Sequence, residues 1–424
     1  MRADPSVVFP ETPARAFQGP ILTGRPGEDV IEDGAVWVVE GRIRWCGQAV
    51  DLPAGINIPV ERVPLILPGL VDVHCHGGMG HTFSADADGA RLAANHHAAQ
   101  GTTSMIASLV SAPSDVLLEQ ITVLRELVPD GTLAGLHLEG PFLSESMCGA
   151  QDPAAIIDGA PVLLKQWLDA GQGTIRSITL APETAHFVEL VSLCRAYDVV
   201  PSLGHTAATA AQVREALAGL REIPGALGMD GGWWSATHLF NRMPPLRHRQ
   251  PGPVAVLLQA AQQHPEQMVL ELIADGVHLD PEIVRMVFAL VGPQSIALIS
   301  DAMAAAGMDD GAYTLGSLDV IVAGGIARLA PVAQETPVGA IAGGTSTLLE
   351  NVRRCVAWGI PLADAVAAAS STPARLMGFD HIGTLTEGSR ADFIVATDEL
   401  EVLQVHRAGA PLQTERIDRA DYSV

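Results

Sequence analysis

The chain has 424 residues, of which 48% are hydrophobic and 17% are charged, a composition typical of a globular protein with a large buried core. Its net charge of −23 argues against nucleic acid as a bulk partner. No apolar run reaches the roughly 18 residues of a membrane span, and the N-terminal stretch MRADPSVVFPETPARAF lacks the apolar segment of a signal peptide. We therefore expect a cytoplasmic protein that acts on small molecules, with neither a membrane nor a nucleic acid as partner.

The cysteines and the single lysine narrow the chemistry. Cysteines are scattered without a C-x-x-C pair, which favours free thiols in a reducing compartment. Cys148 follows a predicted loop, where a redox role stays open. The lysine, Lys165, lies in the helix-like stretch PVLLKQWLDA, so we exclude mechanisms that need a lysine at the end of a strand. The five cysteines are Cys46, Cys75, Cys148, Cys194 and Cys355.

Eight apolar, β-rich runs follow one another after residue 66, and helix-like stretches such as DVLLEQITVLREL separate most of them. Near-continuous apolar strands that alternate with helices indicate a parallel sheet covered on both faces. Eight such units predict an α/β fold of the (β/α)8 TIM barrel type, whose active site lies at the C-terminal ends of the strands. The runs are LVDVHCH (70–76), TTSMIASLV (102–110), GLHLEG (135–140), IRSITLAPE (175–183), VPSLGHT (200–206), WSATHLF (234–240), MVLELIADGVH (268–278) and SIALISDAM (295–303).

The two chain ends have a different pattern. Residues 1–66 contain short strand-like pieces, and residues 380–424 contain similar pieces with turn signals at Glu-Gly and Gly-Ser. We predict that both ends pair in one small β-sandwich domain, built from 1–66 and 380–424, beside a catalytic barrel domain of residues 67–379.

Polar side chains gather at the predicted C-terminal ends of the runs. Any one of them alone could be a loop cap or a satisfied core histidine, but burying an unpaired charge is costly. The whole set at the same end of consecutive strands therefore indicates a functional site. Cys75 lies between two of the histidines on the opposite face, where packing is the favoured role. The set is His74, His76, Glu139, Glu183, His205, His238, Asp275, His278 and Asp301.

Imidazoles and carboxylates in this arrangement suit a divalent metal ion. Glu139, His205 and His238 would supply one carboxylate and two imidazoles from three strand ends, and leave a coordination position open. His74 and His76 could hold a second ion, so we expect one or two ions per subunit. Zinc is the favoured metal, with iron, cobalt or manganese as alternatives. Asp301 would take a proton from water and return it to a leaving group, which suits hydrolysis of an amide or a similar bond.

Beyond this pattern, the sequence resembles the N-acetylglucosamine-6-phosphate deacetylases of the amidohydrolase superfamily. The resemblance runs from about residue 68 to 395 in the family's order. HLEGPF and the stretch around THLFN are its most specific parts, while H-x-H and the tail occur across the wider superfamily. The motifs are PGLVDVHCHGG, GLHLEGPFLSESMCGAQDP, SLGHTAAT, ATHLFNRMPPLRHRQPG, LIADGVHLD, LISDAMAAAG and GTLTEGSRADFIV.

This resemblance implies metal-dependent hydrolysis of the acetamide of N-acetylglucosamine 6-phosphate to glucosamine 6-phosphate and acetate, a step of amino-sugar catabolism and recycling. Glu139, His205 and His238 match the metal ligands, and Asp301 matches the catalytic acid and base. His278 matches the histidine that contacts the sugar and polarises the acetamide carbonyl. A homodimer is also implied. The remaining matches to substrate-binding positions are Ala150, Gln151, Asn241, Arg242, Arg249, Ile341, Ala342 and Gly343, with Arg249 as the phosphate-binding arginine.

The chain departs from the family where the sugar and its phosphate would sit. Gln151 stands in place of histidine, Cys148 in place of a basic residue, Arg242 in place of alanine and Arg247 in place of histidine. The hydrolytic residues are unchanged, so the substrate is what these changes put in question. A deacylase of another N-acylated sugar phosphate and another amidohydrolase-superfamily hydrolase therefore stay open. A non-catalytic sugar-phosphate sensor is disfavoured, since a sensor needs no acid–base aspartate.

Overall fold

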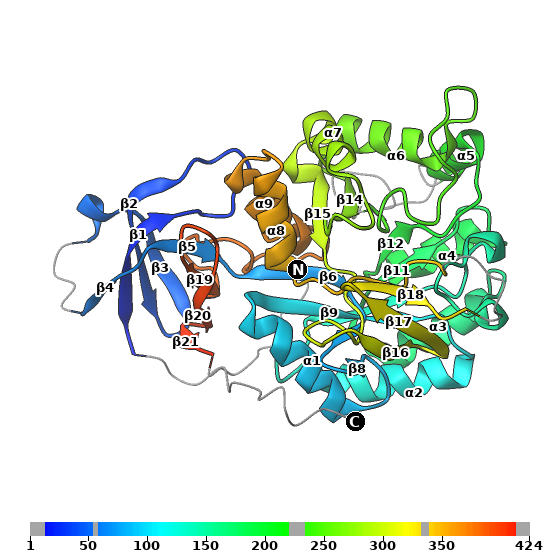
Figure 1. The fold of residues 1–424 in the computed structure, drawn as a ribbon, viewed down its shortest axis with the longest axis horizontal. Coiled ribbons are helices and arrows are strands. Elements are labelled where there is room, and N and C mark those ends of the chain that lie inside the picture. The colour runs from blue at the N-terminus through cyan, green and yellow to red at the C-terminus, as the bar shows by residue number, and fades with distance from the viewer. Residues whose placement is uncertain (1–12, 54–57, 220–233, 332–338, 413–424) are drawn as a thin grey trace.

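The computed structural model describes residues 13–53, 58–219, 234–331 and 339–412. Figure 1 shows a barrel of strands ringed by helices, with a separate β-sheet at its side that contains both ends of the described chain. Within these ranges, no helix combines the length and the apolar character needed to cross a membrane.

The predicted barrel is confirmed, because each of the eight apolar runs contains one strand of a single parallel sheet. The sheet order is β15-β14-β13-β12-β11-β10-β9-β6, so every strand neighbours the next one along the chain. The ring is nearly closed, because the N–H of Asp301, two residues beyond β15, donates to the carbonyl oxygen of His74 in β6 at 2.9 Å. The strands are β6 (Leu70–Cys75), β9 (Thr102–Val110), β10 (Gly135–Glu139), β11 (Ile175–Leu180), β12 (Val200–Leu203), β13 (Trp234–Ala236), β14 (Met268–Ile273) and β15 (Ile296–Ile299).

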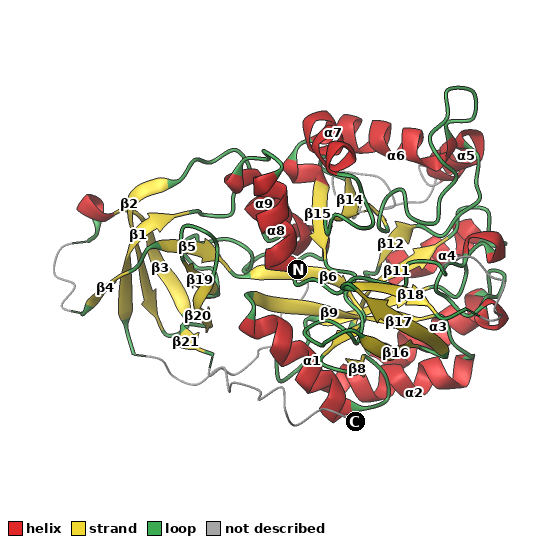
Figure 2. Cartoon of the chain, in the orientation of Figure 1, coloured by secondary structure: helices red, strands yellow, loops and turns green. Residues whose placement is uncertain are grey.

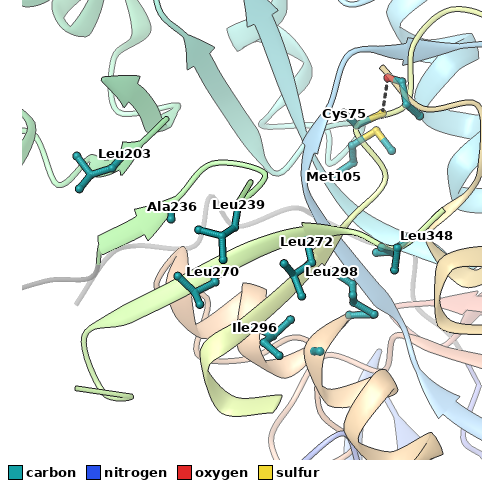
Figure 3. Packing of buried hydrophobic residues seen from close by; sticks show 14 of the residues in the cluster. Cys75, Met105, Leu203, Ala236, Leu239, Leu270, Leu272, Ile296, Leu298 and Leu348 are labelled. Carbon is teal, nitrogen blue, oxygen red and sulfur yellow. Dashed lines mark hydrogen bonds between the residues drawn. The ribbon is translucent and has the colours of Figure 1, made fainter. Parts of the chain in front are cut away.

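Helices surround this ring, as Figure 2 shows in red. Between strands and helices lies a large apolar cluster to which all eight strands contribute, several of them through alternate residues such as Leu270 and Leu272 of β14. Figure 3 shows part of it, with leucines of β12, β14 and β15. The helices are α1 (Ala87–Ala99), α2 (Ser114–Leu124), α3 (Pro161–Gly171), α4 (Phe187–Ala196), α5 (Ala210–Gly219), α6 (Gly252–Gln263), α7 (Pro281–Val291), α8 (Leu348–Ala357), α9 (Leu362–Ala368) and α10 (Ser371–Leu376).

The other face of the strands changes character along their length. A second apolar cluster contains Val71, Ile106, Val200 and Val269 together with residues of α10. Nearer the C-terminal ends, inward positions carry hydroxyls, imidazoles and carboxylates that bond one another. For example, Thr237 Oγ1 lies 2.6 Å from Ser202 Oγ. Apolar packing therefore supports a polar layer beneath the strand ends.

The chain ends pair in one antiparallel-rich sheet of eight strands, ordered β21-β20-β19-β5-β1-β2-β3 with β4 beside β1. The sheet folds back on itself, since the Ile43 N–H donates to Ser389 O at 2.9 Å and the Ala391 N–H to Gly41 O at 2.8 Å. Its enclosed core contains Phe17 and Phe393. The strands are β1 (Arg15–Ile21), β2 (Ile31–Val39), β3 (Arg42–Gln48), β4 (Val60–Arg62), β5 (Leu65–Pro68), β19 (Phe393–Ala396), β20 (Val402–Arg407) and β21 (Ala410–Pro411). The β-sandwich beside the barrel is thus confirmed, while the boundaries at 66 and 380 stay a prediction.

Two small sheets were not predicted. After β15 the chain forms a three-stranded antiparallel sheet of β16 (Gly311–Leu315), β17 (Leu318–Ala323) and β18 (Ile326–Leu329). After β6 it forms the two-stranded pair β7 (Gly77–Gly78) and β8 (His81–Thr82). The three-stranded sheet helps to form the cavity at the barrel mouth, because Leu315 of β16 and the nearby Ile341 line that cavity.

Candidate active site

A cavity of about 310 Å³ opens at the C-terminal ends of the barrel strands. Its walls bring together the side chains that the strand-end pattern singles out, which come from six different strands or the loops that follow them. The site residues in its walls are His76, Glu139, His205, His238, His278 and Asp301. His74 lies behind them and is fully buried.

Glu139, the last residue of β10, is the centre of the cluster. Its Oε1 lies 3.0 Å from His205 Nε2 and 3.1 Å from His238 Nε2. Its Oε2 lies 3.1 Å from His76 Nε2. Two groups of potential metal ligands therefore share Glu139, one with His205 and His238 and one with His74 and His76.

The hydrogen bonds at the far side of the rings fix which nitrogen faces the cluster. His205 Nδ1 lies 2.9 Å from Met147 O, and His76 Nδ1 lies 3.1 Å from Ser108 O. A carbonyl oxygen only accepts, so both Nδ1 atoms carry a proton and each ring turns its Nε2 toward the cluster. A hydrogen bond from the other ring nitrogen to a carbonyl oxygen is what orients metal-binding histidines in proteins.

The donor set fits a divalent metal ion. His205 Nε2 lies 3.1 Å from His238 Nε2, and His74 Nε2 lies 3.2 Å from His76 Nε2. Lone pairs at such separations repel unless a positive charge lies between them, which a metal ion or added protons supply. Imidazole and carboxylate are also the ligands that borderline divalent metals prefer.

Within the cluster, the carboxylates favour the charged form of the imidazoles and the imidazoles favour the charged form of the carboxylates. Burial disfavours a charged His76, yet hydrogen bonds to Asp301 and Glu139 raise its pKa to about 9. Burial likewise opposes a charged Glu139, but its bonds to His205, His238 and the other imidazoles hold its pKa well below the usual range. The cluster therefore favours an ionised carboxylate surrounded by positive charge.

Glu271 and His137 both lie beside the cluster, but only Glu271 bonds to residues of the two ligand groups. Glu271, within β14, was not singled out; its Oε2 lies 3.1 Å from His74 Nδ1 and accepts from the His238 N–H at 3.3 Å. A carboxylate inside the apolar run MVLELIA was the available signal, because such a group is costly to bury unpaired. His137 lies two residues before Glu139 in β10, so strand alternation places the two side chains on one face. Both its ring nitrogens face hydroxyls, with Ser177 Oγ at 2.7 Å and Thr179 Oγ1 at 3.0 Å, so it lies outside the ligand groups.

Three of the site residues share a backbone feature that the sequence does not show. His205, His238 and Asp301 each lie two positions beyond the end of their strand, and their φ angles are +47°, +28° and +47°. Such left-handed conformations cost non-glycine residues on the order of 1–3 kcal/mol and concentrate at functional sites. The turns they make bring the side chains back over the barrel mouth.

Asp301 follows β15 and faces the His74–His76 pair. Its Oδ1 lies 3.3 Å from His76 Nε2 and 3.6 Å from His74 Nε2. Burial favours the neutral acid, but the hydrogen bond from His76 and the nearby imidazoles lower its pKa to about 2. Asp301 is thus a carboxylate at neutral pH, able to accept a proton.

His278 enters the cavity from the loop after β14 and is held by Asp275. Its Nδ1 lies 2.7 Å from Asp275 Oδ2, and both side chains are buried. Desolvation lowers the pKa of His278, but the bond to Asp275 outweighs it and the pKa lies above the usual value, with the charge of Arg242 opposing this rise. The Nδ1–H of His278 donates to the Asp275 carboxylate, so Nε2 is the ring nitrogen that can contact a ligand in the cavity.

Gln151 lies in the cavity wall, but its side chain is turned toward Glu139. Its Nε2 donates to Glu139 Oε2 at 2.6 Å, and its Oε1 accepts from the Ser111 N–H at 2.7 Å. The carboxamide therefore already has partners on both of its polar atoms. Ala150, beside it, also lines the cavity.

The other sequence-predicted residues fall into two groups. Asn241, Arg242, Ile341 and Gly343 line the cavity, as expected of substrate-binding positions. Ala342 is fully buried, and its N–H donates to Ala327 O at 3.0 Å beside β18. Arg249 and Arg247 are exposed on the loop after β13 and are not among the residues that line the cavity.

Two further expectations are settled by contacts. Glu183 anchors a loop: its Oε1 accepts from the Ala207 N–H at 2.6 Å, two residues beyond His205. Cys75 is fully buried, and its Sγ lies 3.7 Å from Ala302 O, so it packs beside the barrel strands rather than among the ligand groups.

Comparison with known proteins assigns the chain, with its barrel and imidazole–carboxylate cluster, to a protein family. The chain belongs to the amidohydrolase family, whose model matches residues 65–411. That family is metal-dependent, in keeping with the donor groups described above.

Several similar proteins are deacetylases of amino-sugar phosphates. The chain is 30% identical to the N-acetylglucosamine-6-phosphate deacetylase of Bacillus subtilis (strain 168), with 88% of this chain and 91% of that protein covered. It is 32% identical to the N-acetylgalactosamine-6-phosphate deacetylase of Escherichia coli O157:H7, with coverages of 83% and 89%. A solved structure of a Mycobacterium smegmatis N-acetyl-D-glucosamine-6-phosphate deacetylase variant, in complex with N-acetyl-D-glucosamine-6-phosphate, superposes with a TM-score of 0.83 at 35% identity and covers 94% of this chain and 99% of its own.

Proposed function

We propose that the protein hydrolyses the acetamide of N-acetylglucosamine 6-phosphate and releases acetate and glucosamine 6-phosphate, a reaction of amino-sugar catabolism and recycling. One observation carries the proposal: a single cavity places Asp301 and His278 beside the Glu139, His205 and His238 group. Its volume of about 310 Å³ is at the small end of ligand pockets, as a monosaccharide requires. The names of the similar proteins support the same substrate class.

The residues divide the chemistry between them. Asp301, ionised because of its low pKa, accepts a proton from the attacking water and later gives it to the departing amine. His278, oriented by Asp275, donates from Nε2 to the acetamide oxygen on which negative charge develops. A divalent metal, when bound, supplies a positive charge that lowers the pKa of water toward about 7 and polarises a carbonyl. Asn241, Ile341 and Gly343 hold the sugar in the cavity.

We propose zinc as the metal, in one or two ions per subunit. Glu139, His205 and His238 would hold the first ion, and His74 and His76 would hold a second with Glu139 between the two. Elemental analysis of protein purified without added metal, expressed per subunit, tests both points. Stoichiometric iron or manganese in place of zinc would refute the choice of metal.

N-acetylgalactosamine 6-phosphate is the second candidate substrate. The Escherichia coli relative that carries this name is as similar to the chain as the deacetylases of the glucosamine compound. The two sugars differ only in the configuration at one hydroxyl, so the same hydrolytic residues would serve both.

We also propose that the protein is a homodimer and that it is located in the cytoplasm. Arg249 is exposed outside the cavity of its own chain, so we place it at the phosphate of a partner subunit in a homodimer. Arg249→Ala should then raise KM for the 6-phosphate, mixing this protein with inactive Asp301→Asn protein should restore sites of wild-type KM, and light scattering should give the dimer mass. We place the enzyme in the cytoplasm, whose reducing conditions suit five unpaired cysteines.

The test of function is acetate release by purified protein from the two 6-phosphates and from unphosphorylated N-acetylglucosamine, each with and without prior chelation. We expect chelator-sensitive turnover that is fastest with N-acetylglucosamine 6-phosphate. A preference for the galactosamine compound would transfer the assignment to the second candidate. Absence of acetate from both sugar phosphates with metal-loaded protein would refute the proposed function.

A further inference from the structure

We propose that the guanidinium of Arg242 binds the sugar phosphate within its own subunit and selects phosphorylated substrate. This inference rests on the proposed function and adds to it a charged side chain at a position where alanine is usual in the family that the sequence resembles. Three independent observations lead to it: the charge of the cavity, the backbone at Arg242 and the space beside Gly149.

The first observation is the set of charged side chains that line the cavity. Arg242 is the one lysine or arginine among the described residues of its lining, and Glu139 and Asp301 are the carboxylates there. Both carboxylates are engaged by imidazoles. Within the described part of the chain, no carboxylate forms an ion pair with the half-buried Arg242 side chain. A partly desolvated guanidinium without a counter-ion, in a protein of net charge −23, favours an anionic ligand.

The backbone at Arg242 is unusual for an arginine. Its φ is +52°, and Phe240 two residues earlier has φ +77°. A bulky residue is seldom found in this left-handed region, where functional side chains are over-represented. The Arg242 carbonyl accepts from the Thr206 N–H at 3.1 Å, which ties this turn to the residue after His205. The origin of the side chain is therefore fixed relative to the imidazole cluster.

The space for the side chain is made by Gly149. Its φ is +67°, and a Cβ at this position would lie 2.5 Å from Arg242 Nε and 2.8 Å from Arg242 Cδ. The arginine stem thus lies directly against the loop that precedes Ala150 in the cavity wall. Two loops, one after β10 and one after β13, hold the guanidinium at the cavity. Its planar fork suits bidentate binding of a phosphate.

The contrast with the neighbouring arginines makes the inference specific. Arg247 and Arg249 are exposed and do not line this cavity. A phosphate in this cavity would therefore meet Arg242 of the same chain whether or not a partner subunit contributes Arg249. The two arginines have separable effects, because Arg242 should act even in a monomer.

The experiment compares Arg242→Ala, Arg242→Lys and Gly149→Ala with the matched control Arg285→Ala, an exposed arginine of α7 that pairs with Glu282 at 2.9 Å. Steady-state constants are measured for N-acetylglucosamine 6-phosphate and for the unphosphorylated sugar, and inorganic phosphate is titrated by calorimetry into each metal-loaded protein. For Arg242→Ala we expect KM for the 6-phosphate to rise about 10- to 100-fold with kcat changed only a few-fold, since charge-assisted bonds of this kind contribute about 1.5–3 kcal/mol. The kcat/KM for the unphosphorylated sugar should change by less than about threefold.

The other variants separate charge from position. Arg242→Lys should recover part of the loss, Gly149→Ala should raise KM while it keeps the charge, and Arg285→Ala should match the wild type. Phosphate binding should weaken in Arg242→Ala. Equal losses for both sugars, or unchanged phosphate binding, would overturn the inference. Phosphate binding that depends on Arg242 in a protein without deacetylase activity would instead uphold the anion site and refute the proposed function.

Discussion

The Gln151 side chain links the central carboxylate of the site to the residue that follows strand β9: Nε2 donates to Glu139 Oε2 at 2.6 Å while Oε1 accepts from the Ser111 N–H at 2.7 Å. Gln151 is buried, with 3% of its surface exposed. The bond holds Glu139 so that Oε1 faces His205 and His238. Gln151 therefore positions the carboxylate that the two groups of potential metal ligands share.

Replacing Gln151 with alanine should weaken metal binding about 10- to 100-fold, as loss of a partner that orients a ligand typically does. Gln151→Glu should weaken it further, because a second carboxylate would face Glu139. Competition with a chromogenic chelator measures the affinity directly, without reference to turnover. Gln212→Ala, on exposed α5, is the control. Wild-type metal affinity in Gln151→Ala would show that Glu139 is oriented without it.

Asp301→Asn should lower kcat by about 10²- to 10⁴-fold, the usual contribution of a general acid and base. The amide keeps the size of the side chain but cannot accept the proton of water. Metal content should stay at the wild-type value, since Glu139 and four imidazoles remain. Asp398→Asn, an exposed turn residue of the end sheet, controls for the loss of one negative charge. An Asp301→Asn enzyme with more than a tenth of wild-type turnover would remove the assigned role.

The Asp275–His278 pair should make stability depend on pH in a defined window. The pKa of His278 is raised above 6.5 in the folded state, so its contribution is present below that value and is lost as pH rises through the raised pKa. The pKa of Asp275 is lowered below 3.8, because its bond and charge interaction with His278 outweigh desolvation, so its contribution is lost only as pH falls through the lowered pKa. The pair therefore stabilises the fold most at mildly acidic pH.

Asp275→Asn should consequently reduce the free energy of unfolding by about 2 kcal/mol near pH 5.5 and by less near pH 9. Denaturant titrations of both proteins at the two pH values, with metal at saturation, make the measurement. Asp169→Asn breaks an exposed pair with Lys165 and should change stability little, and to the same extent at both pH values. An equal loss at both pH values would mean that the His278 charge does not contribute.

The sequence allowed the barrel and most of the cavity to be predicted, for a physical reason. Strands buried on both faces leave long apolar runs, and the rule that parallel strands end at one face places His74, Glu139, His205 and Asp301 together without any coordinates. Glu271 was missed because its partner, His74, lies far away in the chain. The sheet β16–β18 was missed because its strands are short and partly exposed.

The direction of individual side chains lay beyond the sequence. Gln151 was predicted at the sugar and indeed lines the cavity, but both its polar atoms bond protein groups. Its orientation depends on a backbone N–H at Ser111, which no residue pattern reveals. The left-handed turns at His205, His238 and Asp301 are similar, since none of these residues is a glycine or asparagine that would signal them.

Removing the metal should abolish activity and lower the melting temperature, and zinc should restore both. Four imidazoles and the carboxylates of Glu139 and Asp301 form one connected cluster, so a cation that binds them only in the folded state stabilises that state by mass action. At a metal concentration about 1,000 times the Kd, this amounts to about 4 kcal/mol. Melting curves with and without a chelator measure the effect.

Glu139→Ala is the informative variant for this prediction, because Glu139 belongs to both ligand groups. Its melting temperature should no longer respond to zinc or to the chelator. Glu189→Ala, which removes an exposed glutamate of α4 beside His186, should respond as the wild type does. If Glu139→Ala kept the full response to zinc, the stabilising ion would have to be bound elsewhere. The prediction that the barrel-mouth site binds this ion would then be wrong.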